Sequence, residues 1–150
     1  MTDSTDMWRA IREIADDLER LRKADVGGVA VAYTPTYVGG TTAGATTYTL
    51  QQGSYVRLGP VVIATGAVIW TAATGTGNAR ISLPFPAVAV INFTGSVRVE
   101  SVTFANSTPE VEFSNTQQFF VMRSPLTNAG GAVVQVEAAG NIIFTITYFI

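Results

Sequence analysis

The pair of residues that most resembles an acid–base arrangement is Glu110 and Glu112, two residues apart in a segment that alternates acids with Val111 and Phe113. If this segment is a strand, both carboxylates lie on one face, about 6–7 Å apart. That overlaps the carboxyl separation of inverting glycosidases. A glycosidase, however, holds its two carboxylates on opposite sides of the sugar. We therefore expect this pair to belong to a solvated strand face.

The chain lacks the side chains that most often serve as general bases, thiol nucleophiles and zinc ligands, because it contains no His and no Cys. Its single lysine is Lys23, in the charged N-terminal segment, so a Ser–Lys dyad is not available elsewhere. The glycine-rich segments Gly39–Gly44 and Gly75–Gly77 lead into expected strands, whereas a phosphate-binding loop leads into a helix. We predict that the protein is not an enzyme and has no catalytic, cofactor-binding or metal-binding residues.

A binding module needs only exposed aromatic and amide side chains, and the expected loops carry several. The alternative for each of them is an ordinary turn residue or a strand-surface amide. Trp70 ends an apolar strand, and we expect it in the core, with stacking on a sugar as the alternative. The candidate ligand-binding residues are Tyr37, Asn78, Asn106, Asn115, Gln117 and Asn128.

Charge is distributed very unevenly along the chain. The formal net charge is −2, and of the 20 charged residues (9 basic and 11 acidic) twelve lie within the first 25. No basic patch suggests nucleic acid, no apolar run reaches the ~18 residues of a membrane-spanning helix, and the charged N-terminus does not resemble a secretory signal peptide. A body so poor in charge is expected to bury surface between subunits, or to present an uncharged polar exterior.

The segment Thr5–Asp25 has the only sustained helical pattern, and its apolar residues are spaced 4, 3, 4 and 3. This is the a/d seam of a coiled coil, too narrow to be one face of a globular core, so it predicts association with copies of itself. Isoleucine at both a and d favours trimers. The alternative is an amphipathic helix packed on its own head. The predicted oligomerisation residues are Met7, Ile11, Ile14, Leu18 and Leu21.

Three heptads form a marginal coiled coil, so we expect the rest of the chain to supply most of a trimer interface. The predicted organisation is a helical stem over 1–25, a glycine hinge over 26–28, and a head over 29–150.

The head alternates apolar and polar residues in short runs separated by turn residues, which is typical of an antiparallel β-sandwich. We predict a jelly-roll-like sandwich, a loop over Pro35–Thr47, a turn over Gln51–Gly53, and a strand over Val61–Thr71 that is buried on both faces, with a bulge or close approach at Gly66. The other predicted strands are Val29–Tyr33, Tyr48–Leu50, Ser54–Leu58, Arg80–Leu83, Val88–Phe93, Ser96–Phe104, Glu110–Ser114, Gln117–Met122, Ala132–Ala138 and Asn141–Ile150.

Two motifs occur within Ala45–Pro86: a G-x-Y-x-R-L-G run over Gly53–Gly59, and Ser82-Leu83-Pro84-Phe85-Pro86 after a long apolar strand and a Thr/Gly loop. With these landmarks the segment resembles a module common in bacteriophage tail-fibre and other virion-associated proteins. The final residues, NIIFTITYFI, resemble the closing strand of such modules.

The resemblance implies a trimeric β-head on a coiled-coil stem, made in the host cytoplasm and exposed on a virion. It implies a receptor-binding protein that attaches to a saccharide or protein of the host surface, while the stem contacts other virion proteins. The stem is very short, which leaves as an alternative a capsid decoration or head-fibre protein held by its N-terminal helix. A trimeric ligand of the TNF or C1q type is possible by architecture, but the absence of a signal sequence argues against it.

Overall fold

The computed structural model describes residues 4–23, 28–88, 95–104, 109–113, 117–126 and 129–150. The chain is mainly β, with one helix and two antiparallel sheets, as the sequence predicts at this level. Helix α1 covers Ser4–Lys23 and has Asp6 in its first turn, where a negative charge favours the N-terminal end of the helix dipole. In the described part of the chain, no helix combines the length and apolar character needed to cross a bilayer.

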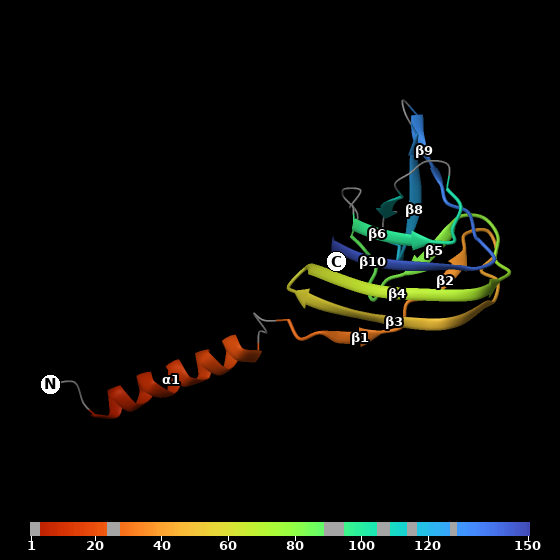
Figure 1. The fold of residues 1–150 in the computed structure, drawn as a ribbon. Helices are drawn as coiled ribbons and strands as arrows, with labels where there is room; N and C mark the ends of the chain where they lie inside the picture. Colours follow the sequence, from red (N-terminus) through yellow and green to blue (C-terminus); the bar gives the residue numbers. More distant parts are fainter. Residues whose placement is uncertain (1–3, 24–27, 89–94, 105–108, 114–116, 127–128) are drawn as a thin grey trace.

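The first sheet contains the longest strands of the protein and has the order β1-β3-β4-β10-β6. In Figure 1 these strands lie nearly horizontal, and α1 extends away from them. Their bounds are β1 Val31–Tyr33, β3 Thr46–Leu58, β4 Val61–Ala73, β6 Gly95–Glu100 and β10 Gly140–Phe149.

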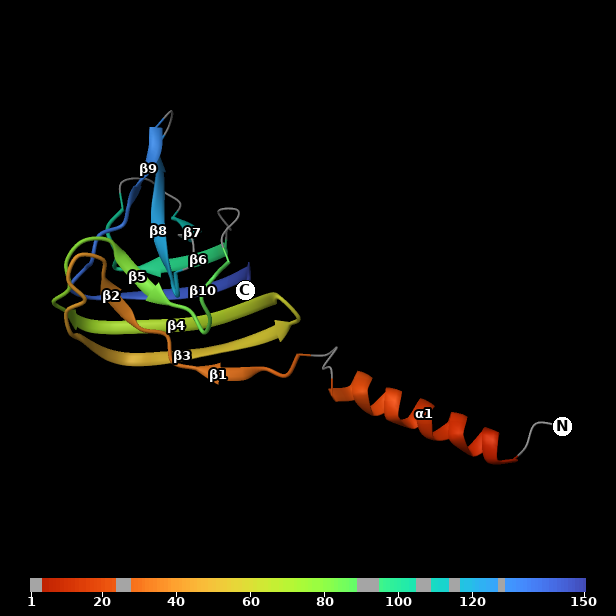
Figure 2. The same cartoon turned by 180° about the vertical axis from the view of Figure 1, so that it is seen from behind.

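The second sheet has the order β2-β5-β8-β7, and β9 also pairs with β8. Figure 2 shows β8 and β9 running across the direction of β3 and β4. Its strands are β2 Tyr37–Gly39, β5 Ala79–Ser82, β7 Glu110–Phe113, β8 Phe119–Leu126 and β9 Ala129–Val133.

The core lies between the two sheets and is built from aromatic pairs that join them. Tyr37 of β2 stacks on Trp70 of β4, with ring centroids 4.0 Å apart. Phe120 of β8 packs against Phe144 of β10 at 5.1 Å. All four side chains are fully buried. Such pairs bury a large apolar area and add stability beyond that burial.

Strand β10 follows the predicted alternation. Ile142, Phe144, Ile146 and Tyr148 are buried in the core, and the residues between them point to the opposite face. The final predicted strand is therefore confirmed. The jelly-roll arrangement and the trimer stay predictions.

The predicted turn at Gln51–Gly53 is wrong, because these residues lie inside the continuous strand β3. Gly53 pairs with Gly66 of β4, and a Cβ on Gly53 would lie 2.6 Å from the ring of Tyr33. This glycine therefore makes room for an aromatic ring and does not bend the chain. The turn lies instead at Gly59, whose φ of 59° suits the first position of a two-residue hairpin.

The prediction that Val61–Thr71 is buried on both faces is also wrong. Val62, Ala64 and Val68 are buried, whereas Ile63 and Thr65 are exposed on the other face. At Gly66 the predicted close approach is confirmed, because a Cβ there would lie 2.5 Å from Cζ of Phe144. The irregularity in the β3–β4 pairing falls between Thr47 and Leu50.

Several other boundaries differ from the prediction. The expected loop over 35–47 contains β2, and β9 covers Ala129–Val133, whereas the predicted strand was Ala132–Ala138. Strand β8 extends four residues beyond the predicted Met122, because its far end pairs with β9. Residues 89–93 of the predicted strand Val88–Phe93 lie outside the described residues.

Candidate functional site

Three of the four carboxylates of the head are bonded to neighbouring residues, two of them in ion pairs with arginines. Glu112 forms an ion pair with Arg123, whose Nη2 also donates to Glu112 Oε1 at 3.2 Å. Glu110 lies opposite Arg123 in the β7–β8 register and is exposed. The two acids share one strand face, as predicted, but Glu112 is half-buried by its partner.

The remaining two acids of the head are also bonded. Glu100 pairs with Arg98 and accepts a hydrogen bond from Asn141 Nδ2 at 3.0 Å, and Glu137 Oε1 accepts one from the Thr103 amide at 3.3 Å. Among the described residues, no three acidic, His or Cys side chains are grouped as a metal site would require.

Tyr37 is not an exposed binding residue, which corrects the sequence interpretation. It is fully buried in β2, and its hydroxyl accepts a hydrogen bond from the Glu137 amide at 2.9 Å. Burial raises the pKa of its phenol above the ordinary value. Trp70 is likewise core, as expected, and its Nε1 donates to the Glu137 carbonyl at 3.0 Å. Neither ring is available to stack on a sugar.

Of the other binding candidates, Asn78 is half-buried and its Oδ1 accepts a hydrogen bond from Gln135 Nε2 at 3.1 Å. Gln117 is half-buried beside β8, and its carbonyl accepts a hydrogen bond from the Ala87 amide at 3.1 Å. Three predicted residues lie outside the described part of the chain: Asn106, Asn115 and Asn128.

The two glycine-rich segments pair with one another and position Asn78. Gly40 N donates to Asn78 O at 2.8 Å, Thr41 N donates to Thr76 O at 2.9 Å, and the hydroxyls of Thr42 and Thr76 lie 2.7 Å apart. Because the loops bond to each other, the end of the head that carries Asn78 is held in place.

The two motifs that carry the resemblance meet around Phe85. Tyr55 contacts the Phe85 ring edge-on at 5.1 Å, and Arg57 lies over the same ring at 5.7 Å. Tyr148 donates to the Phe85 carbonyl at 3.2 Å and accepts from its amide at 3.3 Å. The motifs therefore have a structural role, tying the 82–86 segment to the first sheet.

Helix α1 presents its apolar stripe to solvent. Every side chain from Asp6 to Arg20 is exposed, and Met7, Ile11, Ile14 and Leu18 are 45–60% exposed. The alternative of a helix packed on its own head is therefore not observed in the single chain. The side chain of Leu21, the fifth predicted oligomerisation residue, lies outside the described residues.

A second exposed apolar surface lies on the first sheet, on the side away from the core; we call it the outer face. Among the described residues, its charges are confined to Arg98 and Glu100 on the edge strand β6, which pair with each other. It displays Leu50, Leu58, Ile63, Ile143 and Phe149, each 36–45% exposed.

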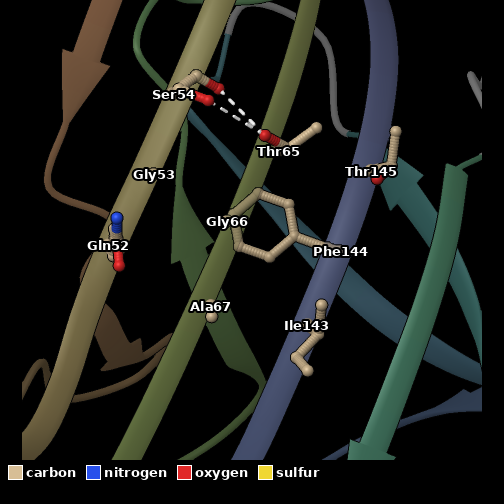
Figure 3. Close-up of a pocket in the computed structure, with 9 residues that line it drawn as sticks. All are labelled: Gln52, Gly53, Ser54, Thr65, Gly66, Ala67, Ile143, Phe144 and Thr145. Atoms are coloured by element: carbon tan, nitrogen blue, oxygen red, sulfur yellow. Dashed lines mark hydrogen bonds between the residues drawn. The ribbon is translucent and has the colours of Figure 1, made fainter.

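The middle of the outer face is hollowed (Figure 3). Small residues of β4, Thr65 and Ala67, lie between Gln52 and Ser54 on one side and Ile143 on the other, around a hollow of about 320 Å³. The hydroxyls of Ser54 and Thr65 are 3.1 Å apart and hydrogen-bonded. The hollow contains no charged group and no general base, so its chemistry is that of a contact surface.

The chain enters the head beside this surface. A Cβ on Gly28 would lie 2.2 Å from Cγ1 of Val56 and 3.3 Å from Cδ2 of Leu58, and both side chains point to the outer face. The alternation of β4 and β10 could have revealed the outer face in the sequence, had both strands been assigned one exposed side.

Sequence reasoning also missed a cation–aromatic contact on the second sheet. Cζ of Arg80 in β5 lies 4.1 Å from the ring centroid of Phe119 in β8. No motif indicates this contact, because the two residues are brought together by the pairing of β5 with β8.

Comparisons with protein-family models, with curated proteins and with solved structures gave no match for this chain.

Proposed function

We propose that this protein is a non-enzymatic fibre or receptor-binding protein of a phage virion. Three copies would attach the particle to a saccharide or protein of the host surface, with the stem contacting other virion proteins. The resemblance of Ala45–Pro86 to virion-associated modules supplies the viral context.

The observation that carries the proposal is the pair of uncovered apolar surfaces on one chain. The stripe of α1 and the outer face are both exposed, and Gly28 lies against the outer face where the chain enters the head. Exposed apolar patches of this kind mark association sites. Copies that join through α1 bring their outer faces together. Because the outer face carries so little charge, two such faces repel each other only weakly.

A trimer of weak binding sites suits attachment, because three sites on one particle gain avidity without any deep pocket. The side chains of the head are also those of a binding module. The chain contains no His or Cys and its single lysine is in the stem, so the polar side chains of the head are mainly hydroxyls and amides.

The length of α1 favours a second candidate, a capsid decoration or head-fibre protein. With 20 residues the helix is about 30 Å long. It would therefore hold the head close to the virion protein that the N-terminus contacts. In that case the head shields the particle and binds no host receptor.

One experiment separates the two candidates. The purified full chain, labelled with a fluorophore, is incubated with host cells and separately with capsids that lack it. A receptor-binding protein binds cells and competes with phage adsorption, whereas a decoration protein binds capsids and leaves adsorption unchanged. Binding to neither would contradict both candidates.

A further inference from the structure

Arg80 lies at the middle of the second sheet, on the side away from the core. Its strand β5 lies between β2 and β8, where Arg80 pairs with Val38 and Val121. The half-buried side chain is held from two directions. The Phe119 ring lies 4.1 Å from Cζ, and a Cβ on Gly40 would lie 3.0 Å from Nε and 3.2 Å from Cζ. The guanidinium is therefore positioned by packing.

The same guanidinium has no acceptor among the described residues, and its Nε is buried. The other arginines of the head are all bonded: Arg57 to the Gly59 carbonyl, Arg98 to Glu100, and Arg123 to Glu112 and the Gly131 carbonyl. A buried donor without an acceptor costs free energy. Because Nε is buried, an acceptor from outside the chain would meet the two Nη groups of this rigidly held guanidinium.

The chemistry of that acceptor follows from the geometry of the donor. A guanidinium presents a planar fork that matches a carboxylate with two parallel hydrogen bonds. The nearest acid across the sheet is Glu112, which lies opposite Val121 and is paired with Arg123. Glu110 is on the same face, two residue pairs farther along β7, and lies opposite Arg123. Neither acid forms an ion pair with Arg80 among the described residues, so its guanidinium is not neutralised by a direct partner.

Amide groups beside Arg80 indicate what else the ligand carries. Asn78 is two residues before Arg80, so the two side chains leave the same face about 6–7 Å apart. Asn78 Oδ1 accepts from Gln135 Nε2, and Gln135 also donates to the Val133 carbonyl at 3.1 Å, so both amides are oriented. Oriented amides next to a guanidinium suit the hydroxyls and the carboxylate of one acidic sugar unit.

We propose that Arg80, supported by Phe119 and flanked by Asn78 and Gln135, forms a binding site for a carboxylate-bearing saccharide. The inference rests on the proposed function in so far as the saccharide belongs to a host surface. Arg80 binds the carboxylate, Phe119 and Gly40 hold the guanidinium in place, and the two amides bind hydroxyls. In a trimer the site occurs three times, so weak binding by each copy is enough for attachment.

The test is an NMR titration of the ¹⁵N-labelled full chain with sodium D-glucuronate, D-glucose and sodium acetate. Glucuronate should shift the Arg80 Nε–H resonance at millimolar concentration, and glucose should not. Arg80→Gln should weaken glucuronate binding at least tenfold. Arg80→Lys should weaken it nearly as much, because lysine keeps the charge but loses the planar fork and the ring contact. Arg98→Gln, an exposed arginine paired with Glu100, is the matched control and should bind as the unmodified chain does.

Equal glucuronate affinity in Arg80→Gln and Arg98→Gln would overturn the proposal, as would equal binding of glucose. Acetate binding as tight as glucuronate binding would overturn the saccharide part, because a bare carboxylate would then account for the affinity. Thermal unfolding of both Arg80 variants verifies that a loss of binding is not a loss of folding. A chain that binds cells but not glucuronate refutes this site alone, and one that binds glucuronate but not cells refutes the attachment function alone.

Discussion

At the scale of single residues, the buried tyrosine hydroxyls differ in whether they are hydrogen-bonded. The Tyr148 hydroxyl bonds both the amide and the carbonyl of Phe85. The Tyr33 hydroxyl is buried and has no partner among the described residues. Tyr148 and Tyr33 therefore provide a matched test of how much a hydrogen-bonded buried hydroxyl contributes to the stability of the head.

We predict that Tyr148→Phe lowers the free energy of unfolding by roughly 1–3 kcal/mol, because it leaves two backbone groups of Phe85 without their partner. Tyr33→Phe should be neutral or stabilising, because it removes an unsatisfied buried group. Urea unfolding followed by fluorescence measures both. Equal losses in the two variants would contradict the assigned hydrogen bonds.

A pH dependence follows from the same tyrosines. Burial raises the pKa of Tyr148 to about 12 and raises the pKa of Tyr33, whereas an unfolded tyrosine titrates near pKa ~10. Because the unfolded chain loses these protons first, stability should be constant up to about pH 10 and should fall as the pH rises toward 12.

Urea midpoints measured from pH 8 to pH 12 test this expectation, together with the phenolate absorbance of the folded chain. Tyr148→Phe should show a smaller loss over the same interval. A midpoint that does not change between pH 10 and pH 12 would refute it.

At the scale of elements, α1 differs from the strands in that no other described element covers its apolar stripe. Its stripe is exposed, and α1 extends away from the head (Figure 1). Helix packing between copies covers such a seam, whereas a strand is covered by the neighbouring strands of its own sheet. We therefore expect the helix to be the element whose stability depends most on the proposed association.

We predict that Ile14→Asp shifts the full chain toward monomer at micromolar concentration, because each copy would bury an unpaired carboxylate in the same layer, at a cost of several kcal/mol per layer. Arg12→Asp, off the stripe, is the control and should leave the assembly intact. Sedimentation velocity gives the oligomer size. An unchanged size in Ile14→Asp would show that the helix is not in the interface.

At the scale of the whole molecule, the two faces of the first sheet have different surroundings. The inner face is covered by the second sheet, and the outer face, with its hollow at Thr65 and Ala67, has no covering element within the described chain. Its apolar residues are spread over β3, β4 and β10, so the surface is broad and shallow. Such a surface suits contact with another copy of the head.

We predict that Thr145→Lys weakens the proposed trimer without unfolding the head, because the exposed Thr145 lies on the outer face beside the hollow and a lysine there would place a charge in the proposed interface. Thr103→Lys is the control, because Thr103 is also exposed and lies in a separate hollow beside Ser124 and Val133 of the second sheet. Sedimentation gives the oligomer size, and far-UV circular dichroism reports folding. If the two variants form trimers of equal stability, the outer face is not part of the interface, even if α1 still associates.

The binding residues were less predictable than the fold class. The period of apolar residues is a local property, so it indicated α1 and β10 directly. Tyr37 was misplaced because its neighbours Pro35 and Gly39 resemble a loop, whereas its ring is buried against Trp70, more than thirty positions later in the chain. The Arg80–Phe119 contact had no local signal at all.

The sequence by itself determined the helix with its exposed seam, the antiparallel β class and the scarcity of catalytic side chains, because periodicity and residue inventory require no knowledge of the partners. Only the tertiary structure decided that Gln51–Gly53 continues a strand, that β4 has one exposed face, and that the Arg80 guanidinium lacks an acceptor. Each of these depends on residues distant in the chain: the ring of Tyr33 over Gly53, the layer that covers one side of the sheet, and the pairing of Glu112 with Arg123.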